Sequence, residues 1–460
     1  MKNIYFILII TMILTSCSKD FIELTPISDA NVENFYLTDE DFNSATVAAY
    51  SNLQEYGQYG SLTSLNGSTF YALTDVRSSD ISDGDAGAGT GVHVYRIDAF
   101  VDDAESPIIE ATWVSLYNQI FKCNTLLNRI ELVETDIELA KQYKGEARFL
   151  RGMAYFNLVR MWGGVPLILE ELESPDASRR FIRTQVEEVY TQILDDLQFA
   201  SQNLPETYSD NDLGRATSWA AKALLGKVYL TRQDWGMAVS TLEDVVNNSG
   251  HALLADVQSL FDTGNEINEE VLFAARFVSG GEVGKDAHVG FGTPNVSNLT
   301  SLYTSNDKRL PLLDIEMSGS AEYVKKHFDA AENQGRDFII LRFADALLMH
   351  AEALNEQGFQ SSGTSFDALN AVRTRAGIDA YSSSELDNQS DFRNAVWQER
   401  RLELAVERHR WFDLLRTGEA KNDLQTVGQT IQDYQLLYPI PQREINAFND
   451  PSGFPQNTGY

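Results

Sequence analysis

A charged but apolar segment near the C-terminus, Ala395 to Gly418 (AVWQERRLELAVERHRWFDLLRTG), most constrains the fold. Written as one helix, it carries apolar residues on more than one face, which is typical of a helix buried by neighbours on several sides. Glu399, Glu403 and Glu407 recur at four-residue steps between these faces. Because an unpaired charge is too costly to bury, each carboxylate should meet a basic partner. We therefore expect a central helix with paired internal charges, which Gly418 ends as a left-handed cap.

The overall composition is that of a large globular protein with an acidic surface. The chain has 460 residues and a formal net charge of −31, so it can bury a sizeable core as one domain or two closely packed halves. Clustered Lys and Arg, which contacts with nucleic-acid phosphates require, are missing, and this argues against a nucleic-acid partner. Surface carboxylates can instead accept hydrogen bonds from hydroxyl-rich ligands.

The N-terminal residues indicate export. Residues 1–16 have the form of a signal peptide, with Lys2 before an apolar run that is too short to span a bilayer stably. The run ends in Leu14-Thr15-Ser16-Cys17, which resembles a bacterial lipobox. We expect cleavage before Cys17 and lipid attachment to it. The alternative, an ordinary secretory signal with an incidental cysteine, explains less well the small residues directly before Cys17.

Helical periodicity continues along most of the remaining chain. It predicts helices at residues 39–54, 107–130, 136–162, 184–203, 215–231, 234–248, 338–357 and 364–376. Leu225-Gly226-x-x-Tyr229 matches the core of a tetratricopeptide helix, and Ala238 with Leu242 matches its partner. Such helix pairs stack into a solenoid. Cys123, inside one of the predicted helices, is expected to be a small core residue.

Two long irregular segments interrupt the helices. Gly57 to Asp103 and residues 249–335 are rich in Gly, Ser and Asp with interspersed aromatic residues, and the second includes a short β-rich piece, Val271–Phe277. Long irregular segments inside a compact domain are usually functional. The apolar content of the tail from Tyr434 onward predicts that it packs onto the body.

Several blocks resemble the SusD/RagB family. ERRLELAVERHRWFDLLRTG (Glu399 to Gly418) is similar to the signature helix of that family. Further similar blocks occur in the family's order: GEARFLRGMAYFNLVRMWGGVPLI (145–168), LRFADALLMHAEALN (341–355), ALNAVRTRAGI (368–378), LYPIPQREI (437–445) and QNTGY (456–460). With the lipobox, the blocks span nearly the whole mature chain. Arg408 departs from the pattern, because the family commonly has Gly there.

The resemblance implies a mostly α fold: a tetratricopeptide-like helical solenoid of four helix pairs supports an irregular, loop-rich ligand-binding face with minor β pieces. It implies a tether at 17–38, an N-terminal region at 39–250 and a C-terminal region at 251–460 packed against it. It also implies a non-enzymatic lipoprotein on the outside of the outer membrane. Such proteins cap a SusC-like TonB-dependent barrel and deliver oligosaccharides, or in some branches peptides, into it.

Sugar recognition needs flat aromatic faces flanked by polar side chains, and the two irregular segments contain both. The candidate glycan-binding residues are Tyr71, Asp75, Arg77, His93, Tyr95, Phe291, Tyr303 and Arg342. We expect the two segments to converge on one face and form the site. The alternative for each aromatic residue is a packing role, and for Arg342 it is a scaffold salt bridge.

Metal binding and catalysis find little support. Asp80, Asp83 and Asp85 lie among glycines, but their spacing does not fit an EF-hand, and a solvated acidic loop is favoured over calcium. We therefore expect no cofactor. Motifs of hydrolases, metalloproteases and P-loops are missing, and we expect no catalytic residues. Glycan capture is the leading function, followed by peptide capture, while a surface glycoside hydrolase is a distant third.

Overall fold

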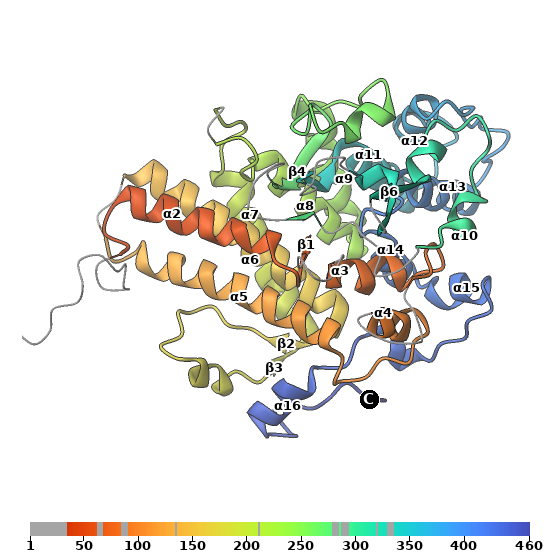
Figure 1. The fold of residues 1–460 in the computed structure, drawn as a ribbon. Coiled ribbons are helices and arrows are strands. Elements are labelled where there is room, and N and C mark those ends of the chain that lie inside the picture. Colours follow the sequence, from red (N-terminus) through yellow and green to blue (C-terminus); the bar gives the residue numbers. More distant parts are fainter. Residues whose placement is uncertain are drawn as a thin grey trace, which may run out of the picture.

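The structure is a computed structural model of the chain, and it describes residues 35–61, 68–83, 91–133, 136–209, 212–277, 285–286, 294–318, 321–328 and 335–460. The lipobox with Cys17, and also Asp85 and Phe291, lie outside these residues. Helices make up most of the described chain (Figure 1). The helices are α2 (Asp39–Tyr50), α3 (Thr69–Tyr71), α4 (Gly91–Asp98), α5 (Pro107–Arg129), α6 (Ile137–Trp162), α7 (Val186–Asn203), α8 (Ser218–Thr231), α9 (Trp235–Asn248), α10 (Ser297–Thr300), α11 (Phe343–Gln357), α12 (Thr364–Arg375), α13 (Gln389–Glu403), α14 (Arg410–Thr417), α15 (Ala420–Gln425) and α16 (Gln442–Phe448).

The long helices form the predicted solenoid. From α5 to α9 each helix packs on the next one along the chain, and α11 then packs on α9, α12 and α13. The two members of the tetratricopeptide-like pair, α8 and α9, meet at Gly226. A Cβ atom on Gly226 would lie only 2.6 Å from Leu242, so glycine permits the close approach of the two helices. This contact confirms the prediction for residues 225–242.

Local sequence explains where these helices begin and end. Thr38 caps α2, because its hydroxyl accepts from the Asp41 N–H while the Asp41 carboxylate accepts from the Thr38 N–H. The Asp136 carboxylate caps α6 by accepting from two N–H groups of the first turn. Gly163, with a φ of +73°, follows the last turn of α6. The caps agree with the helix limits predicted from the sequence.

Four two-stranded antiparallel pairs supplement the helices: β1 (Gly60–Ser61) with β5 (Lys285–Asp286), β2 (Val165–Pro166) with β3 (Arg183–Thr184), β4 (Val271–Ala275) with β8 (Phe338–Arg342), and β6 (Ile315–Ser318) with β7 (Ala321–Val324). Strand β4 confirms the predicted β piece. The prediction of one helix over 338–357 was wrong in its first turn, where β8 precedes α11. Strand β8 begins with the aromatic Phe338 and the β-branched Ile339 and Ile340, and all five of its residues are buried. Its pairing with β4 outweighs helical periodicity.

The predicted continuous helix over Ala395–Gly418 was also wrong. Helix α13 ends at Glu403 and α14 begins at Arg410. Between them the chain turns, and Val406 and Arg408 have φ angles of +62° and +66°. The turn keeps Glu403 and Glu407 on one side, where both reach Arg342. The left-handed cap at Gly418 (φ +77°) is confirmed.

The C-terminal tail packs onto the body, as its apolar content predicts. The Tyr438 side chain is 1% exposed. The Trp162 indole donates to the Pro439 carbonyl, and the Asn457 amide donates to the Trp162 carbonyl. Cys123 lies in the core, where burial raises the pKa of its thiol to about 12. Among the described residues, no helix combines the length and apolar character needed to cross a membrane.

Candidate functional site

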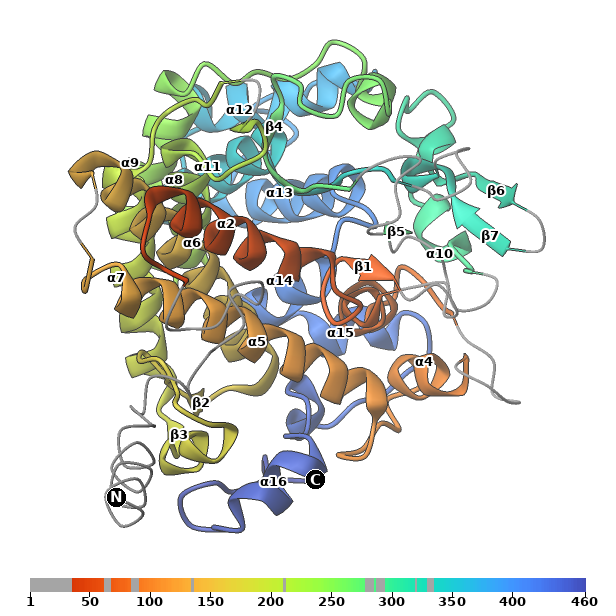
Figure 2. The same ribbon diagram turned by 60° about the vertical axis from the view of Figure 1, so that its left-hand side comes forward.

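The described parts of the two irregular segments meet on one side of the molecule. Gly60 pairs with Asp286, Ser82 forms a bridge with Asn295, and the Asn298 amide donates to the Ser79 carbonyl. In Figure 2, β1, β5 and α10 accordingly lie together. We call the surface formed by these elements and α4 the loop face. The first segment is less irregular than expected, because it contains α3, a π-helical turn (Ala72–Val76) and α4.

Three of the predicted ligand residues lie beneath the loop face. Tyr71, Asp75 and Arg77 are only 3%, 2% and 0% exposed. The Arg77 guanidinium forms an ion pair with Asp102 and lies over the Phe100 ring, 3.9 Å from its centroid. A ligand could reach these side chains only if the segments above them moved, so in this conformation they hold the loop face in place.

Asp75 connects the first irregular segment to the turn between α13 and α14. Its carboxylate accepts from the Arg408 guanidinium at 2.9 Å and from the Arg408 backbone N–H at 3.2 Å. The same guanidinium lies over the Tyr71 ring, 5.0 Å from its centroid. Burial raises the pKa of Asp75, and Arg408 opposes this rise. Arg408 therefore compensates a buried charge.

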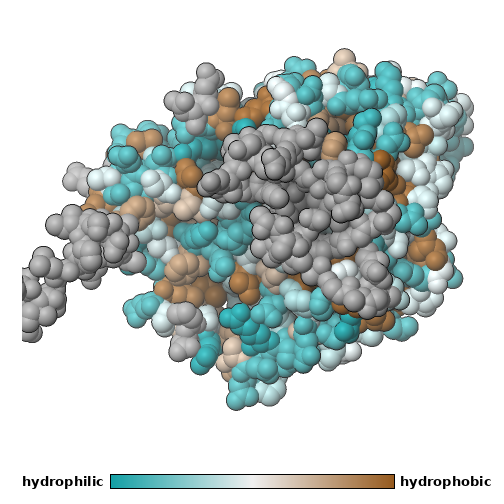
Figure 3. Space-filling model, in the orientation of Figure 1, coloured by the Kyte–Doolittle hydropathy of each residue, from teal (hydrophilic) through white to brown (hydrophobic). Residues whose placement is uncertain are grey.

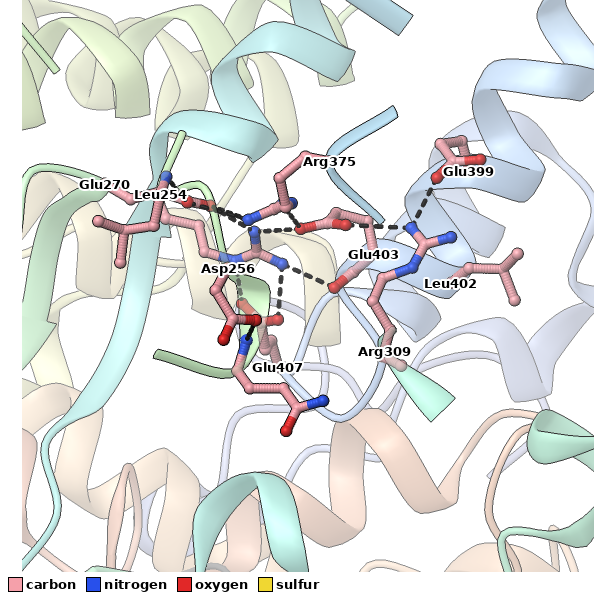
Figure 4. A network of polar contacts seen from close by, with 12 residues as sticks. Leu254, Asp256, Glu270, Arg309, Arg375, Glu399, Leu402, Glu403 and Glu407 are labelled. Atoms are coloured by element: carbon pink, nitrogen blue, oxygen red, sulfur yellow. Dashed lines mark hydrogen bonds and ion pairs between the residues drawn. The ribbon is translucent and has the colours of Figure 1, made fainter. Parts of the chain in front are cut away.

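Arg342 belongs to a buried ionic network. Figure 4 labels other members of this network, among them Glu270, Glu403 and Glu407. The Arg342 guanidinium bonds Glu270 at 3.0 Å, Glu403 at 2.6 Å and Glu407 at 2.7 Å. All four side chains are at most 1% exposed. The alternative prediction for Arg342, a scaffold salt bridge, is therefore confirmed, and so is the pairing of the internal charges on the signature segment.

Further basic residues complete the network around Glu403. Arg309 bonds Glu399 and Glu403 at 2.6 and 3.0 Å, and Arg375 also pairs with Glu403. Burial alone would raise the pKa of Glu403, but the surrounding arginines outweigh it and hold this pKa well below its usual value. Glu403 is thus ionised at neutral pH and ties β8, α12 and α13 together.

The remaining predicted residues differ in their exposure. Tyr303 is 9% exposed, and its hydroxyl donates to the Leu402 carbonyl at 2.6 Å. His93 and Tyr95 lie on α4, and Tyr95 is 40% exposed. Tyr95 is thus the accessible aromatic among the predicted residues that the structure describes. Its role in binding a glycan stays a prediction.

The acidic stretch considered as a calcium site has other partners. The Asp80 carboxylate accepts from Arg401 at 2.7 Å and lies 3.7 Å from Arg410. Within the part of the chain that the structure describes, no group of three His, Cys, Asp or Glu side chains is arranged to hold a metal ion. Asp80 serves here to attach the first irregular segment to α13.

A groove on another part of the molecule was not predicted from the sequence. It lies between α5, the segments flanking β2 and β3, and α16, with a volume of about 650 Å³. Its aromatic lining comes from Trp113, Tyr117, Phe121 and Phe448. Trp113, Tyr117 and Phe121 are spaced four apart on α5, a pattern that is present in the sequence but from which we predicted no site.

Comparisons with known proteins place both ends of the chain in one family. A family model described as "Starch-binding associating with outer membrane" matches residues 27–230, and the model of the SusD family matches residues 315–460. SusD-like protein P25 of Formosa agariphila is 25% identical over 96% of both chains. A SusD-like protein of Bacteroides ovatus is 27% identical over 88% of this chain and 80% of its own length.

Solved structures agree with these relatives. A laminarin-binding SusD-like protein is 26% identical, with a TM-score of 0.76 over 92% of this chain and all of its own. A SusD homologue from Bacteroides thetaiotaomicron shares the fold, with a TM-score of 0.77 at 24% identity over 94% of this chain and 99% of its own. The two family models, the relatives and the shared fold lead to one conclusion: this chain is a member of the SusD family.

Proposed function

We propose that this protein captures oligosaccharides outside the cell without altering them. The observation that carries the proposal is the similarity, over the full length of the relative, to a SusD-like protein that binds laminarin. The description of the N-terminal family model, which names starch binding and the outer membrane, supports the same role. The acidic surface also suits a neutral, hydroxyl-rich ligand better than an anionic one.

The proposed function includes delivery to a membrane partner. Lipid on Cys17 would anchor the protein to the outer membrane, facing the exterior, and a SusC-like TonB-dependent barrel would receive the glycan. Residues 17–38 would form the tether. Labelling of cells with a radioactive or alkyne-bearing fatty acid, followed by Cys17→Ala, tests the anchor: the label should be lost with the cysteine.

We place the glycan on the loop face. Tyr95 supplies an exposed ring on α4, His93 lies two residues earlier, and Phe291 belongs to the segment that follows β5. An aromatic ring can stack on the C–H face of a sugar while nearby polar groups bond its hydroxyls. Tyr71, Asp75, Arg77, Tyr303 and Arg342 would then act indirectly, by holding the face rigid.

A glycan array followed by titration calorimetry tests this assignment. The purified protein should bind at least one neutral glycan, and Tyr95→Ala together with Phe291→Ala should weaken that binding about tenfold or more. Leu132→Ala, which trims a side chain that is 75% exposed near the end of α5, is the control and should leave affinity unchanged. Unchanged affinity in the double variant would remove the site from the loop face, and binding of peptides alone would replace the glycan as the ligand.

A further inference from the structure

A row of aromatic rings lines one face of α5. Trp113, Tyr117 and Phe121 are each four residues apart and all line the groove. Four helical residues advance about 6 Å along the axis, a step close to the length of one sugar ring in an extended pyranose chain. Trp113 is 3% exposed at the inner end of the row, whereas Phe121 is 47% exposed at the outer end. Hydrophobic surface is visible beside α5 in the lower left of Figure 3.

The groove has fixed walls. The Tyr117 hydroxyl donates to the Pro166 carbonyl at 2.9 Å, and its ring lies 5.0 Å from the Trp113 ring. On the opposite wall the Phe448 ring stacks on Phe454, with centroids 3.8 Å apart and an interplanar angle of 4°. A ligand would therefore meet rings that already have defined positions, which lowers the entropic cost of binding.

Polar side chains surround the rings. Asn118, Glu173 and Ser174 are exposed at the groove. The charged lining consists of three carboxylates and two guanidinium groups, from Glu170, Glu173, Glu444, Arg179 and Arg443. This balance offers no excess of positive charge for a sulfated or carboxylated sugar. Donors and acceptors of both kinds beside aromatic faces suit the hydroxyl groups of a neutral sugar.

We propose that this groove is a second glycan-binding site, which holds two or three pyranose units of a neutral oligosaccharide against Tyr117 and Phe121. The proposal rests on the proposed function for the class of ligand, but not on the location of the loop face. Among the elements near the groove, β2, β3 and α16 lie at the bottom of Figures 1 and 2, whereas β1 and α10 lie above them. Its volume of about 650 Å³ is within the usual range for small-ligand sites.

With a second site of this kind, one protein molecule could bind a long polysaccharide at two places. Linking two weak contacts through one glycan chain raises the overall affinity without any new contact, provided that the chain spans both sites. Long glycans should therefore bind more tightly than the short oligosaccharides that fill a single site.

Titration calorimetry of the full-length mature protein tests the second site. The probes are laminarihexaose and the hexaoses of cellulose, mannan and xylan. For the hexaose that binds, the wild type should show two sites. Phe121→Ala and Tyr117→Phe/Phe121→Ala should remove one site or weaken it at least tenfold, while Leu132→Ala should retain both. Phe121→Trp keeps a ring and should retain binding, with a change in indole emission when the sugar is added.

The outcomes separate the two proposals. If a hexaose binds but the Phe121 variants keep the wild-type stoichiometry and affinity, the second site is refuted and glycan capture stands. If none of the four hexaoses binds to the wild type, the second site is refuted, and the glycan array decides separately whether the protein captures another glycan. If only apolar peptides bind and their binding depends on Phe121, the groove is a peptide site and the proposal is wrong.

Discussion

Arg408 combines a left-handed backbone conformation with a buried ion pair to Asp75. Its φ angle is +66°, and its guanidinium lies 2.9 Å from the Asp75 carboxylate. Both side chains are 2% exposed. Glycine, which the family commonly has here, adopts this conformation without strain. In this chain Arg408 has a strained backbone, and its side chain neutralises the Asp75 carboxylate, which anchors the loop face.

Arg408→Gly should therefore destabilise the protein although it relieves backbone strain. Replacing a strained left-handed residue by glycine should stabilise the folded state by about 1–2 kcal/mol. Leaving a buried carboxylate without its partner should destabilise the folded state by about 3–5 kcal/mol. We expect a net loss of about 2 kcal/mol in the free energy of unfolding, measured by urea denaturation. Adding Asp75→Asn should recover most of the loss. If Arg408→Gly is neutral or stabilising by itself, the ion pair contributes little.

Among the carboxylates of the ionic network, Glu403 is the one whose removal should destabilise the protein most. It pairs with Arg309, Arg342 and Arg375, so Glu403→Ala leaves three guanidinium groups with less compensation and should cost about 3–5 kcal/mol. The matched control is Glu138→Ala, which breaks an exposed pair with Lys141 and should change stability by less than about 1 kcal/mol. Similar melting temperatures for the two variants would argue against this role of Glu403.

Asp337 should make stability fall as the pH rises towards neutrality. Burial, which Arg276 only partly offsets, raises the pKa of Asp337 to about 7 from an unfolded value of 3.8. The folded protein thus binds this proton more tightly than the unfolded chain. Its stabilising effect is complete below about pH 4 and is lost as the pH rises to about 7.

Asp337→Asn removes this titration. Between pH 5 and pH 8 the wild type should lose about 2 kcal/mol through this group, and the variant should lose correspondingly less, measured by urea unfolding at both pH values. The network carboxylates do not interfere, because the pKa of Glu403 and that of Glu407 are lowered and their contribution is lost only in acid. An identical pH dependence in the two proteins would refute the assignment.

The α8–α9 pair can be tested with two glycines. Gly226→Ala places a Cβ 2.6 Å from Leu242, and overpacking of this kind costs about 1–3 kcal/mol. Gly236→Ala in the first turn of α9 meets its nearest atom at 3.7 Å and should stabilise by about 0.5–1 kcal/mol through helix propensity. Thermal denaturation should shift in opposite directions. Equal shifts would show that the two helices are not in the predicted contact.

The long helices were predictable because their sequence signals are local. The paired charges were predictable because burying an unpaired charge always costs free energy. Caps at Thr38 and Asp136 and the spacing of apolar residues determine helix limits directly. A row of carboxylates at Glu399, Glu403 and Glu407 demands basic partners wherever it is buried. Which arginines supply them depends on contacts between distant segments, and periodicity carries no such information.

The break between α13 and α14 and the placement of the ligand residues were harder to predict. Valine and arginine normally avoid the left-handed conformation, so the residue types at Val406 and Arg408 do not predict it. Tyr71 and Tyr95 are both aromatic residues of one irregular segment, yet one is buried and the other exposed. The exposure of each side chain depends on the tertiary packing of α3 and α4. Residue type alone could therefore not distinguish aromatic residues that support the loop face from those exposed on it.

Passive capture of a glycan can be tested by titration followed by analysis of the recovered glycan. The purified protein is titrated with the neutral glycan selected on an array, and the glycan is then recovered and assayed for new reducing ends. We expect saturable binding and an unaltered glycan after prolonged incubation. Release of reducing ends, or no binding to any glycan on the array, would contradict passive capture.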